Sequence, residues 1–214
     1  MTYEYRIATP DDLEQLWNFN IADNPDEPAW VRWKGEFLDY NRKGEGITFA
    51  VIADGEAVGE GTLMISPNCK PVRNHPELAD GQTIGNINAL RIRKEYEGQG
   101  HISRMMKLLE QHAREIGLQK LTIGVEANET RNLGIYLHWG YNTLVCWEQE
   151  EDALVLYYEK ANLNVYEVGR GLMKDYILNG RDMTTEAAVC KMMWALGQEN
   201  PTEWLRHRLV GEYR

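Results

Sequence analysis

The pattern of apolar and polar positions along the chain changes between a period of two and a period near 3.6, which predicts both strands and helices. Strand-like runs cover residues 3–9, 47–53, 57–65, 84–92, 121–125, 141–147 and 154–158. Helical patterns cover residues 11–17, 27–42, 102–116 and 130–139. The predicted order, β-α-α-β-β-β-α-β-α-β-β, favours an α/β (α+β) fold in which helices cover a mixed sheet.

Turn and capping residues support these predicted elements. Asp54-Gly55 stands between two apolar runs and predicts a hairpin. Asp11 and Asp12 stand at a helix start, where the helix dipole favours acidic groups. Gly117 follows a helical pattern at the place where a left-handed cap is expected. Residues 66–84 show little periodicity and predict a long loop, a kind of segment that often carries function.

Composition and charge narrow the class of protein. The chain has 214 residues, 43% hydrophobic and 26% charged, and lacks an apolar run long enough to span a membrane or a signal peptide. Its three cysteines form no CxxC pair, so we expect a cytoplasmic protein without a disulfide framework or a metal site. The net charge of −10 argues against nucleic-acid binding. It either attracts a cationic substrate or serves solubility alone.

After Lys160 the pattern becomes strand-free, so we expect a main domain over residues 1–160 and a helical appendage over residues 161–214. Residues 182–188 resemble the C-terminal end of bacterial L-asparaginases, whose catalytic threonine motifs are missing here. A segment of this length buries little surface by itself. We therefore expect the appendage to pack on the main domain or to shape a homodimer.

The stretch from Leu90 to Ser103 indicates a strand, a glycine turn and a helix. Such a turn points unpaired N–H groups at the helix N-terminus toward one spot, where phosphate binds. Gly98 and Gly100 allow a close approach of the backbone to a ligand. A Walker loop needs a Gly-Lys-Ser/Thr that is absent, and a dinucleotide fingerprint needs three glycines after the first strand of a βαβ unit, whereas this turn follows the fourth predicted strand. Two interpretations of the turn remain: a site for the pyrophosphate of coenzyme A, or a purely structural turn.

A second stretch, from Val125 to Tyr141, ends in Tyr136-Leu137-His138-Trp139-Gly140-Tyr141. Together the two stretches resemble the GNAT superfamily of N-acetyltransferases, over roughly residues 3–160. The resemblance implies a GNAT-type, mostly antiparallel sheet whose fourth and fifth strands splay apart around acetyl-CoA. It also implies that Tyr136 protonates the departing thiolate, although a core tyrosine has the same pattern.

The resemblance implies two groups of site residues. The cofactor would be held by the fourth strand and the turn, with help from two asparagines: Leu90, Arg91, Ile92, Glu97, Gly98, Gln99, Gly100, His101, Ile102, Ser103, Asn128 and Asn132. The acceptor would meet Trp30, Trp33, Asn86 and Asn88, although tryptophans on a helix stripe also build cores.

Four positions depart from the family pattern. Glu97 replaces an arginine or glutamine, Ile102 replaces a small residue, and Glu129 stands where many relatives have asparagine. Asn86 occupies the place of a glutamate base, and an amide accepts no proton at neutral pH. The amine would then lose its proton through water, or to Glu60 or His75, both of which also fit ordinary surface residues.

These observations favour transfer of an acetyl group from acetyl-CoA to a primary amine of a small molecule or peptide, with no metal. The alternative is a non-catalytic module that binds coenzyme A, because Glu97, Ile102 and Asn86 depart from the pattern. A remote third possibility, an asparagine-binding relic, rests on the tail alone.

Overall fold

The computed structural model describes residues 1–150 and 153–161, and the predicted appendage lies outside this part except for its first residue. The described residues divide into two compact units, one of residues 1–121 and one of the described residues from 122 onward. Within the described residues, no helix is both long and apolar enough to cross a membrane.

Four antiparallel strands form the sheet of the first unit, in the order β1 (Tyr3–Ile7), β2 (Gly46–Ala53), β3 (Glu56–Met64) and β4 (Ile84–Ile92). The predicted hairpin joins β2 to β3, and Asp54 and Gly55 both have positive φ angles, of 47° and 91°. This is the backbone that an Asp-Gly turn favours. Neighbours in sequence are therefore neighbours in this sheet.

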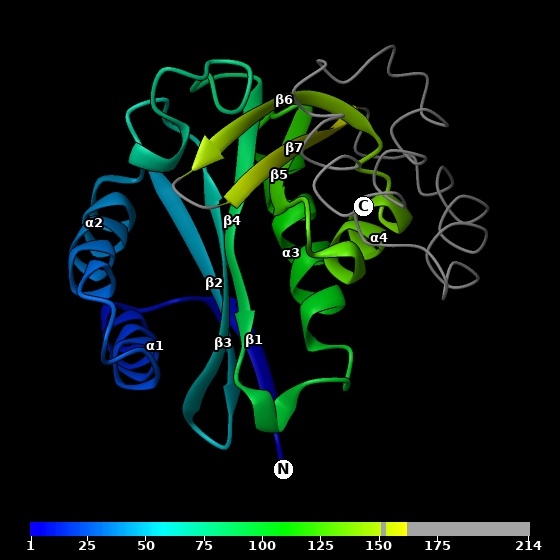
Figure 1. Cartoon of the computed structure of the whole chain (residues 1–214). Helices are drawn as coiled ribbons and strands as arrows, with labels where there is room; N and C mark the ends of the chain where they lie inside the picture. The colour runs from blue at the N-terminus through cyan, green and yellow to red at the C-terminus, as the bar shows by residue number, and fades with distance from the viewer. Residues whose placement is uncertain (151–152, 162–214) are drawn as a thin grey trace, which may run out of the picture. The chain divides into compact units, whose positions relative to one another are not determined.

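Three helices cover this sheet: α1 (Pro10–Asp23), α2 (Ala29–Lys43) and α3 (His101–Glu115). Figure 1 shows α1 and α2 on one side of the strands and α3 on the other. Helix α3 approaches β3 so closely that a Cβ at Gly61 would lie 2.9 Å from Leu109 Cδ1. On the opposite side, the Thr62 hydroxyl pairs with Thr48, which in turn bonds Asn41 of α2. Alternate residues of β3 thus face different helices.

The second unit contains β5 (Lys120–Glu126), which begins just before the boundary, then α4 (Thr130–His138), β6 (Thr143–Glu150) and β7 (Ala153–Ala161). Strand β7 lies between β5 and β6, and β6 and β7 are antiparallel. The Tyr141 side chain is fully buried, and Gly140, with φ at 96°, ends the α4 segment.

The predicted order of strands and helices is confirmed, and the differences lie at element ends. Strand β1 stops at Ile7 because Thr9 caps α1 in a capping box with Asp12. Ile116, placed on the apolar face by periodicity, is 41% exposed because α3 ends at Glu115. The loop after β3 contains a short 3₁₀ helix, Lys70–Val72, and buries several side chains, so it is well packed.

Candidate acyl-transfer site

Strand β4 carries a bulge at its centre. Glu60 pairs with Arg91 and Thr62 pairs with Asn88, so Ala89 and Leu90 together stand opposite Gly61. Ala89 has a φ of 50°, which is rare for a residue with a side chain. A bulge interrupts the ladder of main-chain hydrogen bonds and re-aims side chains beyond it.

The bulge decides which β4 side chains share a face. Asn86 and Asn88 lie on the side of α1 and α2, as their partners Met64 and Thr62 do, and this shared face confirms simple alternation. Beyond the bulge, Arg91 joins that same face, because its partner is Glu60. Leu90 instead faces α3, since its Cδ1 would lie 2.9 Å from a Cβ at Gly61. Without the bulge, strict alternation would place Leu90 on the α1 and α2 side and Arg91 on the α3 side.

The glycine turn after β4 has the backbone that an anion site needs. Gly98 and Gly100 have φ angles of 73° and 81°, and Gly100 is the N-cap of α3 without a side-chain cap. Among the described residues, no main-chain or side-chain acceptor bonds the N–H groups of residues 98–103. A Cβ at either glycine would meet nothing within 4 Å, so the space on the Cβ side of both glycines is open.

The His101 side chain anchors the turn to β1. Its ring is buried, with Nδ1 2.6 Å from the Tyr5 hydroxyl and its centroid 4.4 Å from that of Tyr3. Burial lowers the pKa of His101, and the charge of Arg104 lowers it further. The Tyr3 hydroxyl also donates to Gln99 Oε1 over 3.1 Å. The imidazole is therefore directed inward and leaves the main chain of the turn to meet a ligand.

Two residues that depart from the family pattern, Glu97 and Ile102, belong to this turn. Glu97 is exposed, so its carboxylate is free to stay in solvent. Ile102 is half-buried, and Ser103 and Arg104 are exposed on the first turn of α3. Arg104 rests on the Tyr5 ring, 5.1 Å from its centroid, and carries a positive charge on the first turn of α3.

A second polar cluster lies on the α1 and α2 side of the sheet. Glu60 is 1% exposed, which corrects the expectation of a solvated carboxylate. Its Oε1 accepts hydrogen bonds from Arg91 Nε at 3.0 Å and Asn20 Nδ2 at 3.1 Å. The Arg91 guanidinium lies 4.6 Å from the Trp17 ring centroid and 4.9 Å from that of Trp30. We call this cluster of Glu60, Arg91, Asn20, Trp17 and Trp30 the polar box. The sequence shows only a polar residue on a strand at position 60, and the box appears only through tertiary contacts.

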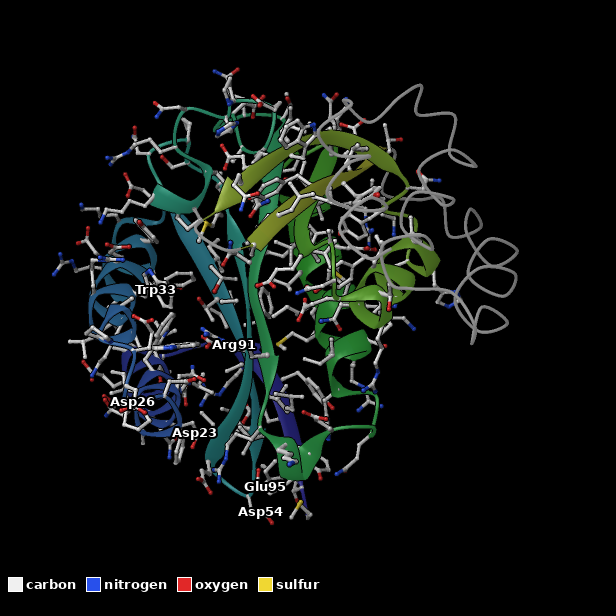
Figure 2. All side chains as sticks on the ribbon, viewed as in Figure 1. Asp23, Asp26, Trp33, Asp54, Arg91 and Glu95 are labelled. Carbon is white, nitrogen blue, oxygen red and sulfur yellow. The ribbon has the colours of Figure 1, made fainter. Side chains whose placement is uncertain are left out.

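The predicted acceptor tryptophans lie at the rim of this box. Trp30 and Trp33 are half-buried and pack edge to face, with centroids 5.2 Å apart. Figure 2 shows Trp33 on α2, with Arg91 extending from β4 toward α1 and α2. Deeper on the same stripe, Phe37 and Tyr40 are buried. The aromatic stripe of α2 is therefore core at Phe37 and Tyr40 and partly accessible at Trp30 and Trp33.

His75, the other candidate base, lies in the loop after β3 and pairs with Glu77 through Nδ1 at 2.9 Å. It belongs to that loop and takes no part in the box.

In the second unit, Tyr136 lies on α4, half-buried, with its ring 5.8 Å from that of Trp139. Burial raises the pKa of Tyr136 to about 12, and the charge of Glu129 adds to the rise. Asn132 donates to Glu129 Oε2 at 3.0 Å, and Asn128 is exposed in the turn before α4. The phenol therefore stays protonated at neutral pH.

Comparison with known proteins identifies the fold. An N-acetyltransferase from Staphylococcus aureus Mu50 covers 77% of this chain and all of its own, with a TM-score of 0.55 and 16% identity. A Salmonella typhimurium protein, described as an acetyltransferase with its cofactor acetyl-CoA, covers 78% of this chain and 98% of its own, with a TM-score of 0.57 and 11% identity. At such identities the likeness establishes the fold alone.

Curated relatives match only a short stretch. A glutamyl-tRNA(Gln) amidotransferase subunit from Methanobrevibacter smithii is 46% identical over 60 residues, which are 26% of this chain and 14% of that protein. The chain thus spans about a seventh of that relative. These matches do not support the predicted asparaginase-like tail, which lies outside the described residues.

The model of the acetyltransferase (GNAT) family matches residues 11–141, a range that runs from α1 through β4, the glycine turn and α3 to the end of the Tyr136–Tyr141 motif. The mixed α/β architecture with its mostly antiparallel strands agrees with this match. The chain belongs to the acetyltransferase (GNAT) family.

Proposed function

We propose that the protein is an N-acetyltransferase that moves an acetyl group directly from acetyl-CoA to a primary amine of a small molecule or peptide. The observation that carries this proposal is the turn at residues 97–103. It combines two left-handed glycines with a series of unpaired N–H groups at the N-terminus of α3.

The turn fits the pyrophosphate of coenzyme A by chemistry and by space. Main-chain N–H groups and the positive end of a helix dipole stabilise phosphate oxygens. Arg104 adds a positive charge at the same end of α3, and Glu97 is exposed and able to turn away. Gly98 and Gly100 carry no side chain and have open space on the Cβ side, which would let the diphosphate approach the backbone closely.

The bulge of β4 suits the acyl end of the same molecule. Residues 90–92 continue from the bulge to the turn, so their main-chain groups follow the path expected for the pantetheine arm. In our proposal a main-chain N–H near Leu90 polarises the thioester carbonyl. The Arg91 side chain faces the other way, toward α1 and α2, so only the backbone of Arg91 would meet the cofactor.

We assign to Tyr136 the donor of a hydrogen bond to the departing sulfur, and the free thiolate then takes its proton from solvent. Its phenol, with a pKa raised to about 12, stays protonated over the whole working range, whereas a thiol ordinarily titrates near pH ~8.5. Equilibrium transfer to a free thiolate is therefore uphill. The phenol then acts by hydrogen bonding to the sulfur as negative charge develops in the transition state.

Thiol release from acetyl-CoA over a panel of amines, polyamines, aminoglycosides and N-terminal peptides tests the proposal. We expect amine-dependent release by the natural protein and a fall in kcat of ~10²- to 10⁴-fold in Tyr136→Phe. Tyr158→Phe is the matched control, since burial also raises the pKa of Tyr158, whose hydroxyl has no hydrogen-bond partner among the described residues. Binding of acetyl-CoA without transfer to any amine would favour the non-catalytic module instead.

A further inference from the structure

The buried carboxylate of Glu60 is satisfied on one side only. Its Oε1 accepts from Arg91 Nε and Asn20 Nδ2, and Arg91 Nη2 lies 2.7 Å from the same oxygen. The other oxygen, Oε2, is buried and has no hydrogen-bond partner among the described residues. An unpaired carboxylate oxygen is costly in a protein interior and calls for a bound water or a ligand group.

A donor in the same box is also unpaired. Trp17 is 1% exposed, and its indole N–H has no hydrogen-bond partner within residues 1–150 and 153–161. Its ring contacts the guanidinium that Glu60 holds, so the Trp17 ring and the Glu60 carboxylate both contact Arg91. A bound water or a polar ligand group would satisfy each of these atoms.

The position of Glu60 in the sheet connects this box to the proposed reaction. Glu60 is one residue from Gly61, the residue opposite the β4 bulge, and its side chain is on the α1 and α2 side. Asn86, Asn88 and Arg91 share that side. Leu90 faces the other way, toward α3. The carboxylate therefore lies beside the bulge on the face that carries the predicted acceptor residues.

We infer that Glu60 accepts the proton of the acceptor ammonium group through one bound water, and that Arg91 is the positioning residue that holds the carboxylate in place. This inference rests on the proposed acetyl transfer. In the step, the ammonium nitrogen gives one proton to the water, and a proton of the same water passes to Glu60 Oε2. The neutral amine that results is the nucleophile, and Glu60 later returns its proton to solvent.

The surroundings of Glu60 suit a proton acceptor. Burial raises the pKa of this carboxyl above the ordinary value, and the facing charge of Arg91 opposes the rise. The neighbours from α1 and α2, namely Asn20, Trp17 and Trp30, carry no charge. A carboxylate made more basic by burial and kept in place by one arginine is a better base than an exposed one.

The sequence offers a matched control on the same two strands. Glu56 of β3 pairs with Arg93 of β4 at 2.6 Å, and Arg93 lies over the Phe19 ring as Arg91 lies over Trp17. The Glu56 side chain is 42% exposed, however, whereas that of Glu60 is 1% exposed. Glu56→Gln thus removes the same kind of ion pair without touching the buried box.

The test is the pH profile of kcat/KM for the natural protein, Glu60→Gln and Glu56→Gln with one primary amine. At pH 7 we expect Glu60→Gln to lose ~10²- to 10⁴-fold. The loss should shrink to within about tenfold near pH ~10, where a primary amine loses its proton unaided. Glu56→Gln should follow the natural profile at every pH.

A loss in Glu60→Gln that is the same at all pH values, or no loss, would overturn the inference and leave acetyl transfer intact. Inactivity of the natural protein on every amine would overturn both. If Glu60→Gln does not fold because Arg91 loses its partner, the double variant Glu60→Gln/Arg91→Gln removes both charges and carries the same expected profile. Its control is Glu56→Gln/Arg93→Gln.

Discussion

Replacing Gly100 by alanine isolates the role of the turn in binding coenzyme A. Gly100 has a φ of 81°, and a left-handed backbone costs a residue with a Cβ about 1–2 kcal/mol. No atom lies within 4 Å of the added Cβ, so the cost is backbone strain without a clash. In a chain of this size each kcal/mol lowers Tm by about 2–4 °C, so we expect a decrease of about 2–8 °C.

The strained turn relaxes by moving its φ toward negative values, and this movement turns the N–H groups of residues 98–103 away from a shared target. We therefore expect the affinity for acetyl-CoA to fall at least ~tenfold, or ~1.4 kcal/mol. Calorimetric titration with acetyl-CoA measures this loss, and a thermal melt of the free protein measures the strain.

Gly117→Ala is the matched control for Gly100→Ala. Gly117 stands at the other end of α3 with a φ of 88°, and a Cβ added there would also meet nothing within 4 Å, so its backbone cost is similar. We expect the same decrease in Tm with unchanged affinity for acetyl-CoA. Equal losses of affinity in the two variants, or natural affinity in Gly100→Ala, would refute the assignment of the turn as the pyrophosphate site.

Two further predictions concern stability. Burial raises the pKa of Asp12, but hydrogen bonds from Arg6 and Thr9 outweigh burial and hold this pKa below its usual range. The charged Asp12 carboxylate therefore stabilises the fold above pH ~4, and this stabilisation is lost as pH falls through the lowered pKa. Urea unfolding should show Asp12→Asn less stable by about 1–3 kcal/mol at pH 7, with the difference shrinking as pH falls through the lowered pKa of Asp12; a constant difference would contradict this. Leu109→Ala removes a fully buried side chain that packs on Gly61 and should cost about 2–5 kcal/mol in the same assay; a cost below ~1 kcal/mol would argue against that packing.

Most of the fold follows from local sequence signals. The period of the apolar positions, the Asp54-Gly55 turn and Gly117 are properties of short stretches, and they predict the order of elements and most of their ends. The family motif likewise places the glycine turn between β4 and α3, where the structure has it. Such signals require no knowledge of which strands become neighbours.

The polar box could not be predicted in this way. The bulge at Ala89 breaks the alternation that assigns Arg91 to a face, and nothing in residues 84–92 marks it. Glu60 resembles a solvated strand residue because its partners, Asn20 and Arg91, come from distant parts of the chain. His101 is also placed by remote contacts, with Tyr3 and Tyr5. Burial of a charged or titratable group depends on its tertiary partners, and those partners appear only once the chain is folded.

The most direct measurement of the central claim compares the binding of acetyl-CoA with that of S-acetylpantetheine, which lacks the diphosphate and the nucleotide. Titration calorimetry of both compounds with the natural protein and with Gly100→Ala gives four dissociation constants. We expect acetyl-CoA to bind the natural protein more tightly than S-acetylpantetheine, and we expect Gly100→Ala to weaken the binding of acetyl-CoA alone. Equal affinity of the natural protein for the two compounds would contradict a pyrophosphate site at the turn of residues 97–103.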